Sequence, residues 1–273
     1  MAASVVSRLT GADVVIQDDG SRGGMVDLRV AYQNRAPGFV EVVTDITPGY
    51  ASLYAELLKR GGQVPHICEA AGLDRVWLMT VSERCELKRL TTSAPMLLSR
   101  LATAGTTDGF VAGHGQAVEN PEVAQLMRMG VVQLSCRPLR EDESARMLVW
   151  PEGVAGPVVP NWEAFLGWID RKLTSKHWQD NARKLSATKA AERHLFIGVS
   201  FSTVGEVFLA LSYDHQSLPP APPRLPSAFT HLWIMPIQGP GRCLAWFPDR
   251  GWFDPCRHWA SEGKATIRLH RGI

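Results

Sequence analysis

Three short segments near the N-terminus alternate apolar and polar residues in the manner of β-strands. They cover residues 13–17, 25–32 and 39–45, and the turn-forming segments 18–24 and 33–38 separate them. A period of two is typical of strands that bury one face. The pattern therefore predicts a three-stranded meander at the start of the chain.

Helices and buried strands follow the meander. A helix is predicted over 48–60, with Thr47 as its N-cap and Pro48 at its first position. The alternation of strands and helices predicts a mixed α/β protein, with residues 1–140 and 141–273 as its two regions. The remaining predicted strands are 74–82, 131–139, 194–201, 230–237 and 242–250, and the remaining predicted helices are 84–104, 120–130, 161–173 and 204–212.

Composition adds little about partners but excludes some classes of protein. Of the 273 residues, 45% are hydrophobic and 21% charged, and the formal net charge is +2, as in ordinary globular proteins. Five widely spaced cysteines without a CxxC pair argue against a disulfide scaffold or a cysteine-rich zinc site. We find no apolar signal-peptide core and no long apolar span, so we expect a cytoplasmic protein without membrane association.

The second and third predicted strands each carry one carboxylate, Asp27 and Glu41. A three-residue loop at 33–35 would place Asp27 directly opposite Glu41, whereas a longer odd loop would place Arg29 there. The first register brings together two carboxylates, which repel unless a cation such as Mg²⁺ lies between them. The second register forms a cross-strand ion pair. A further alternative is that Asp27 pairs with Arg29 or Arg22.

The strand order and these two acids resemble the PD-(D/E)XK nuclease superfamily over roughly residues 13–82. The resemblance implies a nuclease-like βββαβ core with a mixed sheet, extended by the C-terminal half. It also implies that Asp27 and Glu41 are catalytic residues that bind Mg²⁺ for phosphodiester hydrolysis. The lysine position of the family is Val43 here. Because some members move this group to the following helix, Lys59 becomes the candidate for the third catalytic residue.

A basic stretch over residues 171–193 holds seven lysines or arginines against two acids, with Trp178 available for base stacking. The alternative is an ordinary solvated helix face. The candidates for nucleic-acid binding are Lys172, Lys176, Arg183 and Lys184.

Three other residue pairs are weaker candidates for catalysis or metal binding. A His–Asp pair in a Gly-rich loop could exchange protons, and a Cys–His pair could supply a nucleophile or half a metal site. A surface loop or core packing is the more common explanation for each pair. The pairs are His114 with Asp108, Cys256 with His258, and His66 with Cys68.

The sequence thus favours a nucleic-acid-associated protein of nuclease-like fold, in which metal-dependent hydrolysis is weak or lost. The alternative is a non-catalytic protein that binds a protein partner through its Trp-rich C-terminal half, because seven of nine tryptophans follow residue 160. The chain as a whole also resembles proteins of high-GC actinobacteria.

Overall fold

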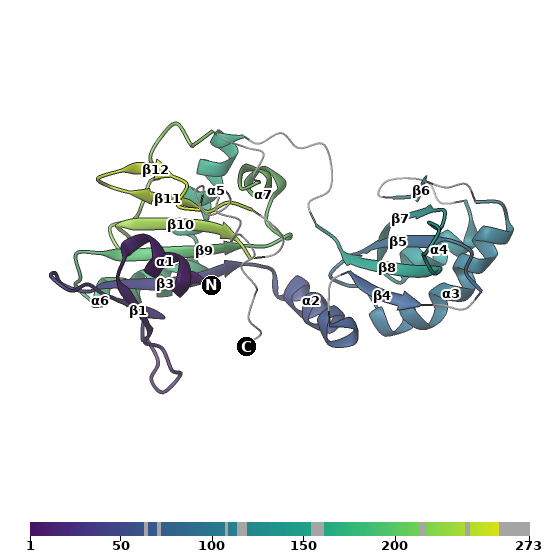
Figure 1. Ribbon diagram of the computed structural model, residues 1–273, viewed down its shortest axis with the longest axis horizontal. Coiled ribbons are helices and arrows are strands. Elements are labelled where there is room, and N and C mark those ends of the chain that lie inside the picture. Colours follow the sequence, from purple (N-terminus) through teal and green to yellow (C-terminus); the bar gives the residue numbers. More distant parts are fainter. Residues whose placement is uncertain are drawn as a thin grey trace. The chain divides into compact units, whose positions relative to one another are not determined.

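The chain forms two units, one of which is inserted into the other (Figure 1). The computed structural model describes residues 1–62, 65–69, 72–106, 109–113, 119–153, 161–212, 217–237 and 241–256. The first unit comprises Met1–Asp45 and Val154–Ile273, and the second comprises Ile46–Gly153. This division differs from the expected boundary at residue 140, because the N-terminal strands pair with strands from the end of the chain.

The first unit is built on a mixed sheet, as the α/β prediction requires. Its central strands β3, β9 and β10 are parallel to each other, and the outer strands are antiparallel. The C-terminal half therefore extends the sheet of the N-terminal meander. In spatial order, the described strands are β1 (Asp13–Ile16), β2 (Leu28–Ala31), β3 (Gly38–Asp45), β9 (Arg193–Val199), β10 (His231–Pro236), β11 (Leu244–Phe247) and β12 (Gly251–Phe253).

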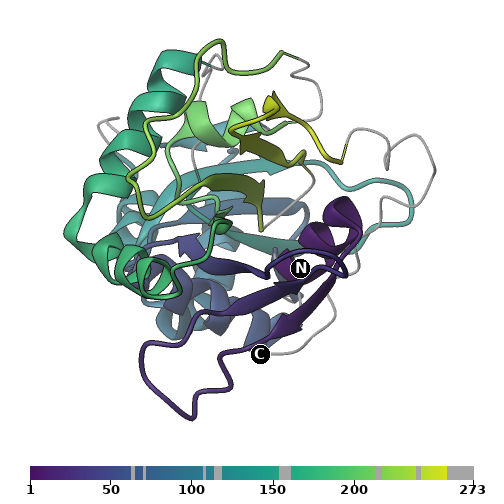
Figure 2. The same ribbon diagram turned by 90° about the vertical axis from the view of Figure 1, so that its left-hand side faces the viewer.

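Helices cover both faces of this sheet (Figure 2). On one face, Val5 and Val6 of α1 pack with Val40 of β3, and on the other face Phe165 of α5 and Leu185 of α6 pack against β9. Helix α1 was not predicted from the sequence. The helices of this unit are α1 (Ala2–Thr10), α5 (Trp162–Thr174), the 3₁₀ turn η1 (Lys176–Trp178), α6 (Gln179–Ala187) and α7 (Gly205–Ala210).

The tryptophans of the C-terminal half mainly build the core. Trp168, Trp178 and Trp233 are at most 3% exposed. Strand β10, which contains Trp233, is buried along its whole length, as expected for a strand covered on both faces. Core packing therefore accounts for much of the tryptophan enrichment.

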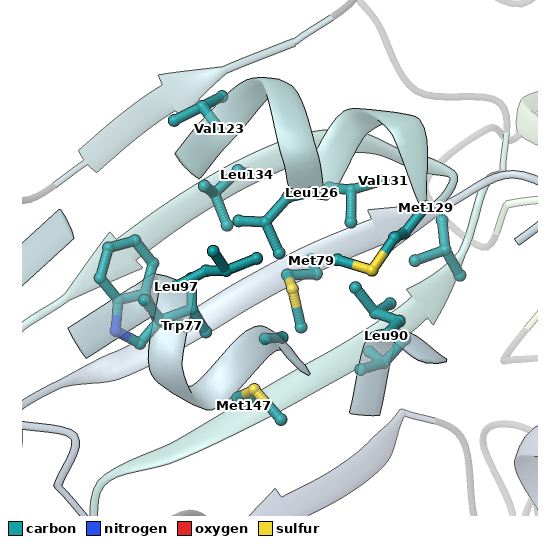
Figure 3. Close-up of a cluster of buried hydrophobic side chains, with 14 of the residues drawn as sticks. Trp77, Met79, Leu90, Leu97, Val123, Leu126, Met129, Val131, Leu134 and Met147 are labelled. Atoms are coloured by element: carbon teal, nitrogen blue, oxygen red, sulfur yellow. The ribbon is translucent and has the colours of Figure 1, made fainter. Parts of the chain in front are cut away.

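The second unit has its own sheet and its own hydrophobic core. Figure 3 shows Trp77, Met79, Leu97, Leu134 and Met147 in this core, and all five are at most 1% exposed. The strands, in spatial order, are β4 (His66–Glu69), β8 (Arg146–Pro151), β5 (Val76–Val81), β7 (Val131–Arg137) and β6 (Gly109–Ala112). The helices are α2 (Pro48–Gly61), α3 (Leu87–Thr103) and α4 (Pro121–Arg128).

Local signals placed helix α2 correctly. The Thr47 side chain accepts a hydrogen bond of 3.2 Å from the backbone N–H of Tyr50, and Pro48 begins the helix. Gly62 ends it in the left-handed conformation, with φ of 68°.

Strand β5 was expected in the same sheet as the meander. It lies instead in the sheet of the second unit, and β9 pairs with β3. The predicted βββαβ core over residues 13–82 is therefore not formed by those residues. Within the described ranges, no helix combines the length and apolar character needed to cross a membrane.

Candidate functional site

Asp27 lies at the end of the β2–β3 ladder, near Glu41. The ladder pairs Leu28 with Val40 and Arg29 with Phe39, and Asp27 lies in the bend just before the first of these pairs. This excludes the alternative in which Arg29 faces Glu41. Asp27 lies just before β2, and its Oδ2 accepts a hydrogen bond of 2.6 Å from the backbone N–H of Val42. This bond holds the Asp27 carboxylate against β3, beside Glu41.

Glu41 forms a buried ion pair with a helix on one face of the sheet. Its residue exposure is 2%, and Lys184 of α6 donates a hydrogen bond of 2.8 Å from Nζ to Oε1. The other carboxylate oxygen, Oε2, is also buried and accepts no hydrogen bond from the described residues. The backbone N–H of Asp27 also interacts with the Glu41 carboxylate and lowers its pKa, so the cost of burying this carboxylate is partly offset.

The electrostatics of this cluster place its proton exchange near neutral pH. Burial raises the pKa of Glu41 to about 7, against the opposing hydrogen bond from Lys184, and the charge of Asp27 raises it further. The hydrogen bond to Glu41 raises the pKa of Lys184.

A recess lies beside Asp27 on the α1 face of the sheet, and neither Glu41 nor Lys184 lines it. Its volume is about 380 Å³, and its lining includes Asp18, Asp27, Thr44 and Gly198 together with the first residues of α1. Gly198 is required here, because a Cβ at this position would lie 2.5 Å from Cγ2 of Ile237. The recess is large enough for a hydrated ion or a phosphate group.

A second acid–lysine pair lies four residues along β3, at Asp45. Lys172 of α5 forms an ion pair with Oδ1 of Asp45, and Trp168 Nε1 donates a hydrogen bond of 3.2 Å to Oδ2. The backbone carbonyl of Asp45 accepts hydrogen bonds from the hydroxyls of Ser200, at 2.8 Å, and Thr203, at 3.1 Å. Both carboxylate oxygens are satisfied, which is typical of a structural pair.

Asp27 and Glu41 supply two neighbouring carboxylates. Among the described residues, no group of three or more His, Cys, Asp or Glu side chains could hold a metal. Mg²⁺, however, is commonly bound by one or two carboxylates and completes its shell with water and substrate phosphates. Of the two carboxylates, that of Asp27 lines the recess, whereas Glu41 is 2% exposed and does not line it.

The third predicted catalytic residue belongs to the other unit. Lys59 lies on α2 of the second unit, where its neighbours Glu56 and Arg60 form an ion pair of 2.8 Å. Lys184 of the first unit contacts Glu41 instead. No local signal in the sequence links Lys184 to Glu41, because the two are 143 residues apart.

The four basic candidates for nucleic-acid binding do not form one exposed stripe. Lys172 and Lys184 point to the strand acids Asp45 and Glu41. Lys176 is exposed. The Arg183 side chain is 80% exposed and pairs with Asp180 on the same helix. Of these four residues, only Lys176 and Arg183 thus present their charge to solvent.

The remaining predicted pairs give no catalytic arrangement. His114, Asp108 and His258 lie outside the described residues. Cys256 is buried in a hydrophobic cluster of the first unit, and Cys68 packs against the core of the second unit. Both thiols therefore behave as small core residues.

Sequence reasoning missed a second polar cluster, centred on Glu192. Tyr32 donates a hydrogen bond of 2.5 Å to Glu192, which also pairs with Arg35. The rings of His194 and His231 stack with centroids 4.3 Å apart. The contact with His194, 3.5 Å from Nε2 to Oε2, and the hydrogen bond from Tyr32 lower the pKa of Glu192 to about 2, and burial lowers that of His231 to about 4. Tyr32 and Glu192 are 160 residues apart, so no local pattern could reveal them.

Comparisons with known proteins add no family assignment. No protein-family model, curated protein sequence or solved structure matches this chain. The geometry around Asp27, Glu41 and Lys184 therefore carries the functional argument.

Proposed function

We propose that the first unit is a nucleic-acid-associated domain of nuclease-like fold, with weak metal-dependent phosphodiester hydrolysis. The observation that carries this proposal is the convergence of Asp27, Glu41 and Lys184 from two strands and one helix. Two carboxylates and a lysine are the residue types that such chemistry requires.

The order of elements in the first unit supports the same proposal. When Ile46–Gly153 is set aside, β1, β2 and β3 are followed by α5 and α6 and then by β9, which is parallel to β3. This is the βββαβ order that the sequence resemblance implies. In this unit the helices α5 and α6 follow the third strand, and α6 carries Lys184, whereas the lysine position of the family is Val43.

Each of the three residues has a defined role in the proposed chemistry. Asp27 and Glu41 would hold the cation, through the carboxylate fixed by Val42 and the unsatisfied Oε2. A bound Mg²⁺ supplies an activated water and neutralises charge on the phosphoryl group. Lys184 would hold its ammonium beside the reacting phosphate and stabilise the negative charge that develops there.

Phosphate contacts outside the cluster would come from exposed basic side chains of η1 and α6. Lys176 at the start of η1 and Arg183 on α6 present their side chains to solvent. Binding through such contacts weakens as salt is added, because it releases counterions from the nucleic acid. We keep the cytoplasm as the proposed location of this activity.

The interaction alternative has less structural support. The tryptophans that suggested a recognition surface are in large part core residues, with Trp168, Trp178 and Trp233 fully covered.

The test is cleavage of labelled DNA and RNA, single- and double-stranded, in Mn²⁺ and in Mg²⁺. We expect Glu41→Gln and Lys184→Met each to slow cleavage by about a hundredfold or more. Lys172→Met removes a lysine from the comparable pair with Asp45 and should leave the rate unchanged. Equal rates for wild type and Glu41→Gln would refute the catalytic assignment.

If the wild type does not cleave, the nucleic-acid association is tested by the salt dependence of binding. We expect Lys176→Ala and Arg183→Ala each to reduce the slope of log affinity against log salt by about one. Absence of both cleavage and binding would overturn the whole proposal.

A further inference from the structure

The two cysteines of the first unit lie next to each other in its hydrophobic core. Cys243 is fully buried and Cys256 is 6% exposed, and both belong to the cluster that packs on the α1 face of the sheet. Both are free thiols, and a hydrogen bond joins their side chains. The other three of the five cysteines belong to the second unit.

This pair of thiols connects the two arms of a β-hairpin at the edge of the sheet (Figure 1). Cys243 directly precedes β11, and Cys256 follows the last residue of β12, Phe253, by three positions. Between Phe253 and Cys256 the chain turns, and the backbone N–H of Cys256 donates a hydrogen bond of 2.9 Å to Oδ1 of Asp254. Strand β12 is joined to β11 through three residue pairs, and so short an edge opens more easily than the central strands.

We propose that Cys243 and Cys256 are a site of reversible oxidation, at which a peroxide converts the two thiols to a disulfide that cross-links the β11–β12 hairpin. The inference is independent of the proposed function. In a reducing compartment the pair remains as the two thiols of the structure. Oxidation then adds a covalent bond at the edge of the sheet, where a few backbone pairs hold β12.

The oxidation takes place in two balanced steps. Cys256 retains some exposure, so its thiol reacts with hydrogen peroxide, becomes a sulfenic acid and releases one water. The sulfur of Cys243 then attacks the sulfur of the sulfenic acid, so that the S–S bond forms as the S–O bond breaks and a second water leaves. The two thiols lose two protons and two electrons in total, and the peroxide is reduced to two waters.

Burial gives Cys243 the second role. Burial raises the pKa of the Cys243 thiol, and the hydrogen bond with Cys256 raises it further. Cys243 is therefore uncharged and shielded from the oxidant. Its contact with Cys256 nevertheless makes the second step intramolecular, which favours the disulfide over further oxidation of Cys256 to a sulfinic acid.

The first test maps disulfides in the full-length wild-type protein after treatment with hydrogen peroxide, by mass spectrometry of an unreduced digest. We expect a pair of peptides linked through Cys243 and Cys256, which dithiothreitol separates. Cys136 is the control for burial, because it is 2% exposed and lies in the second unit, and it should remain a thiol. Recovery of both cysteines as thiols, or of Cys256 as a sulfinic acid with Cys243 still a thiol, would overturn the proposal.

Two variants test the order of the steps. In Cys243→Ser the sulfenic acid has no second thiol to attack it, so dimedone, which traps sulfenic acids, should label Cys256. In Cys256→Ser, Cys243 should remain a thiol because burial shields it from peroxide. Labelling of Cys243 in the second variant as fast as that of Cys256 in the first would show that the roles are assigned wrongly.

Hydrogen exchange measures the effect of the cross-link on the hairpin. We expect the amides of β11 and β12 to exchange about tenfold more slowly, or slower still, in the oxidised wild type than in the reduced protein, because the disulfide restricts opening of the edge. Amides of β5, in the second unit, should exchange at the same rate in both forms. Peroxide treatment of Cys256→Ser should leave exchange in β11 and β12 unchanged. Equal exchange in the oxidised and reduced wild type would contradict a stabilising cross-link.

Discussion

Lys184 on α6 donates a 2.8 Å hydrogen bond to Glu41 on β3, across a separation of 143 residues. The parallel pairing of β3 with β9 makes this contact possible, because α6 leads directly into β9 and so lies over β3. Along the sequence, the whole of the second unit lies between Glu41 and Lys184. The pair therefore depends on tertiary structure alone.

The first prediction concerns the stability of this pair. Lys184→Met leaves the 2%-exposed Glu41 without its cation, and we expect a loss of about 3 kcal/mol in the free energy of unfolding. Lys172→Met disrupts a pair whose lysine side chain is 35% exposed, and we expect about 1 kcal/mol or less. Urea denaturation of both variants measures the difference. Equal losses would show that burial does not make the Glu41 pair more important for stability than the Asp45 pair.

The second prediction concerns pH. Burial raises the pKa of Glu41 to about 7 from an ordinary value of 4.5, so the folded state binds a proton more tightly than the unfolded state does. The resulting stability is fully present below about pH 4.5 and is lost as the pH rises through about 7.

Glu41→Gln removes this dependence. In metal-free buffer, the wild type should lose about 3 kcal/mol of unfolding free energy as the pH is raised from acid to neutral or alkaline values, and Glu41→Gln should not show this loss. A pH-independent difference would mean that the carboxyl titrates normally in the folded protein.

The third prediction concerns the Glu192 cluster and has the opposite sign. Burial lowers the pKa of His231 to about 4 from 6.5, so the unfolded state binds the proton more tightly. The contribution of His231 is present above about pH 6.5 and is lost as the pH falls towards about 4.

His231→Phe keeps an aromatic ring against His194 and Phe247 but cannot titrate. The wild type should therefore lose about 3 kcal/mol more stability than this variant over that acid range. Unfolding curves at several pH values provide the measurement, and parallel losses in the two proteins would contradict the assignment.

The fourth prediction tests the packing of the second unit. Gly130 has φ of 99°, and a Cβ there would lie 2.6 Å from Cα of Cys85. Gly105 has φ of 81°, but a Cβ added to it would point into open space. Gly105→Ala should cost only the backbone strain, about 1 kcal/mol, whereas Gly130→Ala should cost at least about 3 kcal/mol. Thermal or chemical unfolding of the two variants compares them directly.

Local patterns predicted most of the elements, because helices and strands bury faces with a fixed period. The meander, the helix capped by Thr47 and the doubly buried β10 all follow from such patterns. The nearness of Asp27 to Glu41 follows from one of two registers that the sequence allowed, and the observed pairing selects it.

Long-range pairing was beyond the reach of these patterns. Nothing local shows that β3 pairs with β9 or that β5 belongs to another sheet, because buried strands of similar composition are interchangeable in sequence. For the same reason Lys59 was chosen as the lysine near the acids, when Lys184 occupies that place. The meander and its acids could be predicted, and the helix that completes the site could not.

The most direct test of the account is a calorimetric titration of metal-free protein with Mn²⁺ and Mg²⁺, in wild type, Asp27→Ala and Asp45→Asn. The account predicts one binding event in the wild type, its loss in Asp27→Ala and its retention in Asp45→Asn, whose carboxylate is already satisfied by Lys172 and Trp168. Binding of equal strength in Asp27→Ala and wild type would contradict the proposal that Asp27 and Glu41 form the cation site.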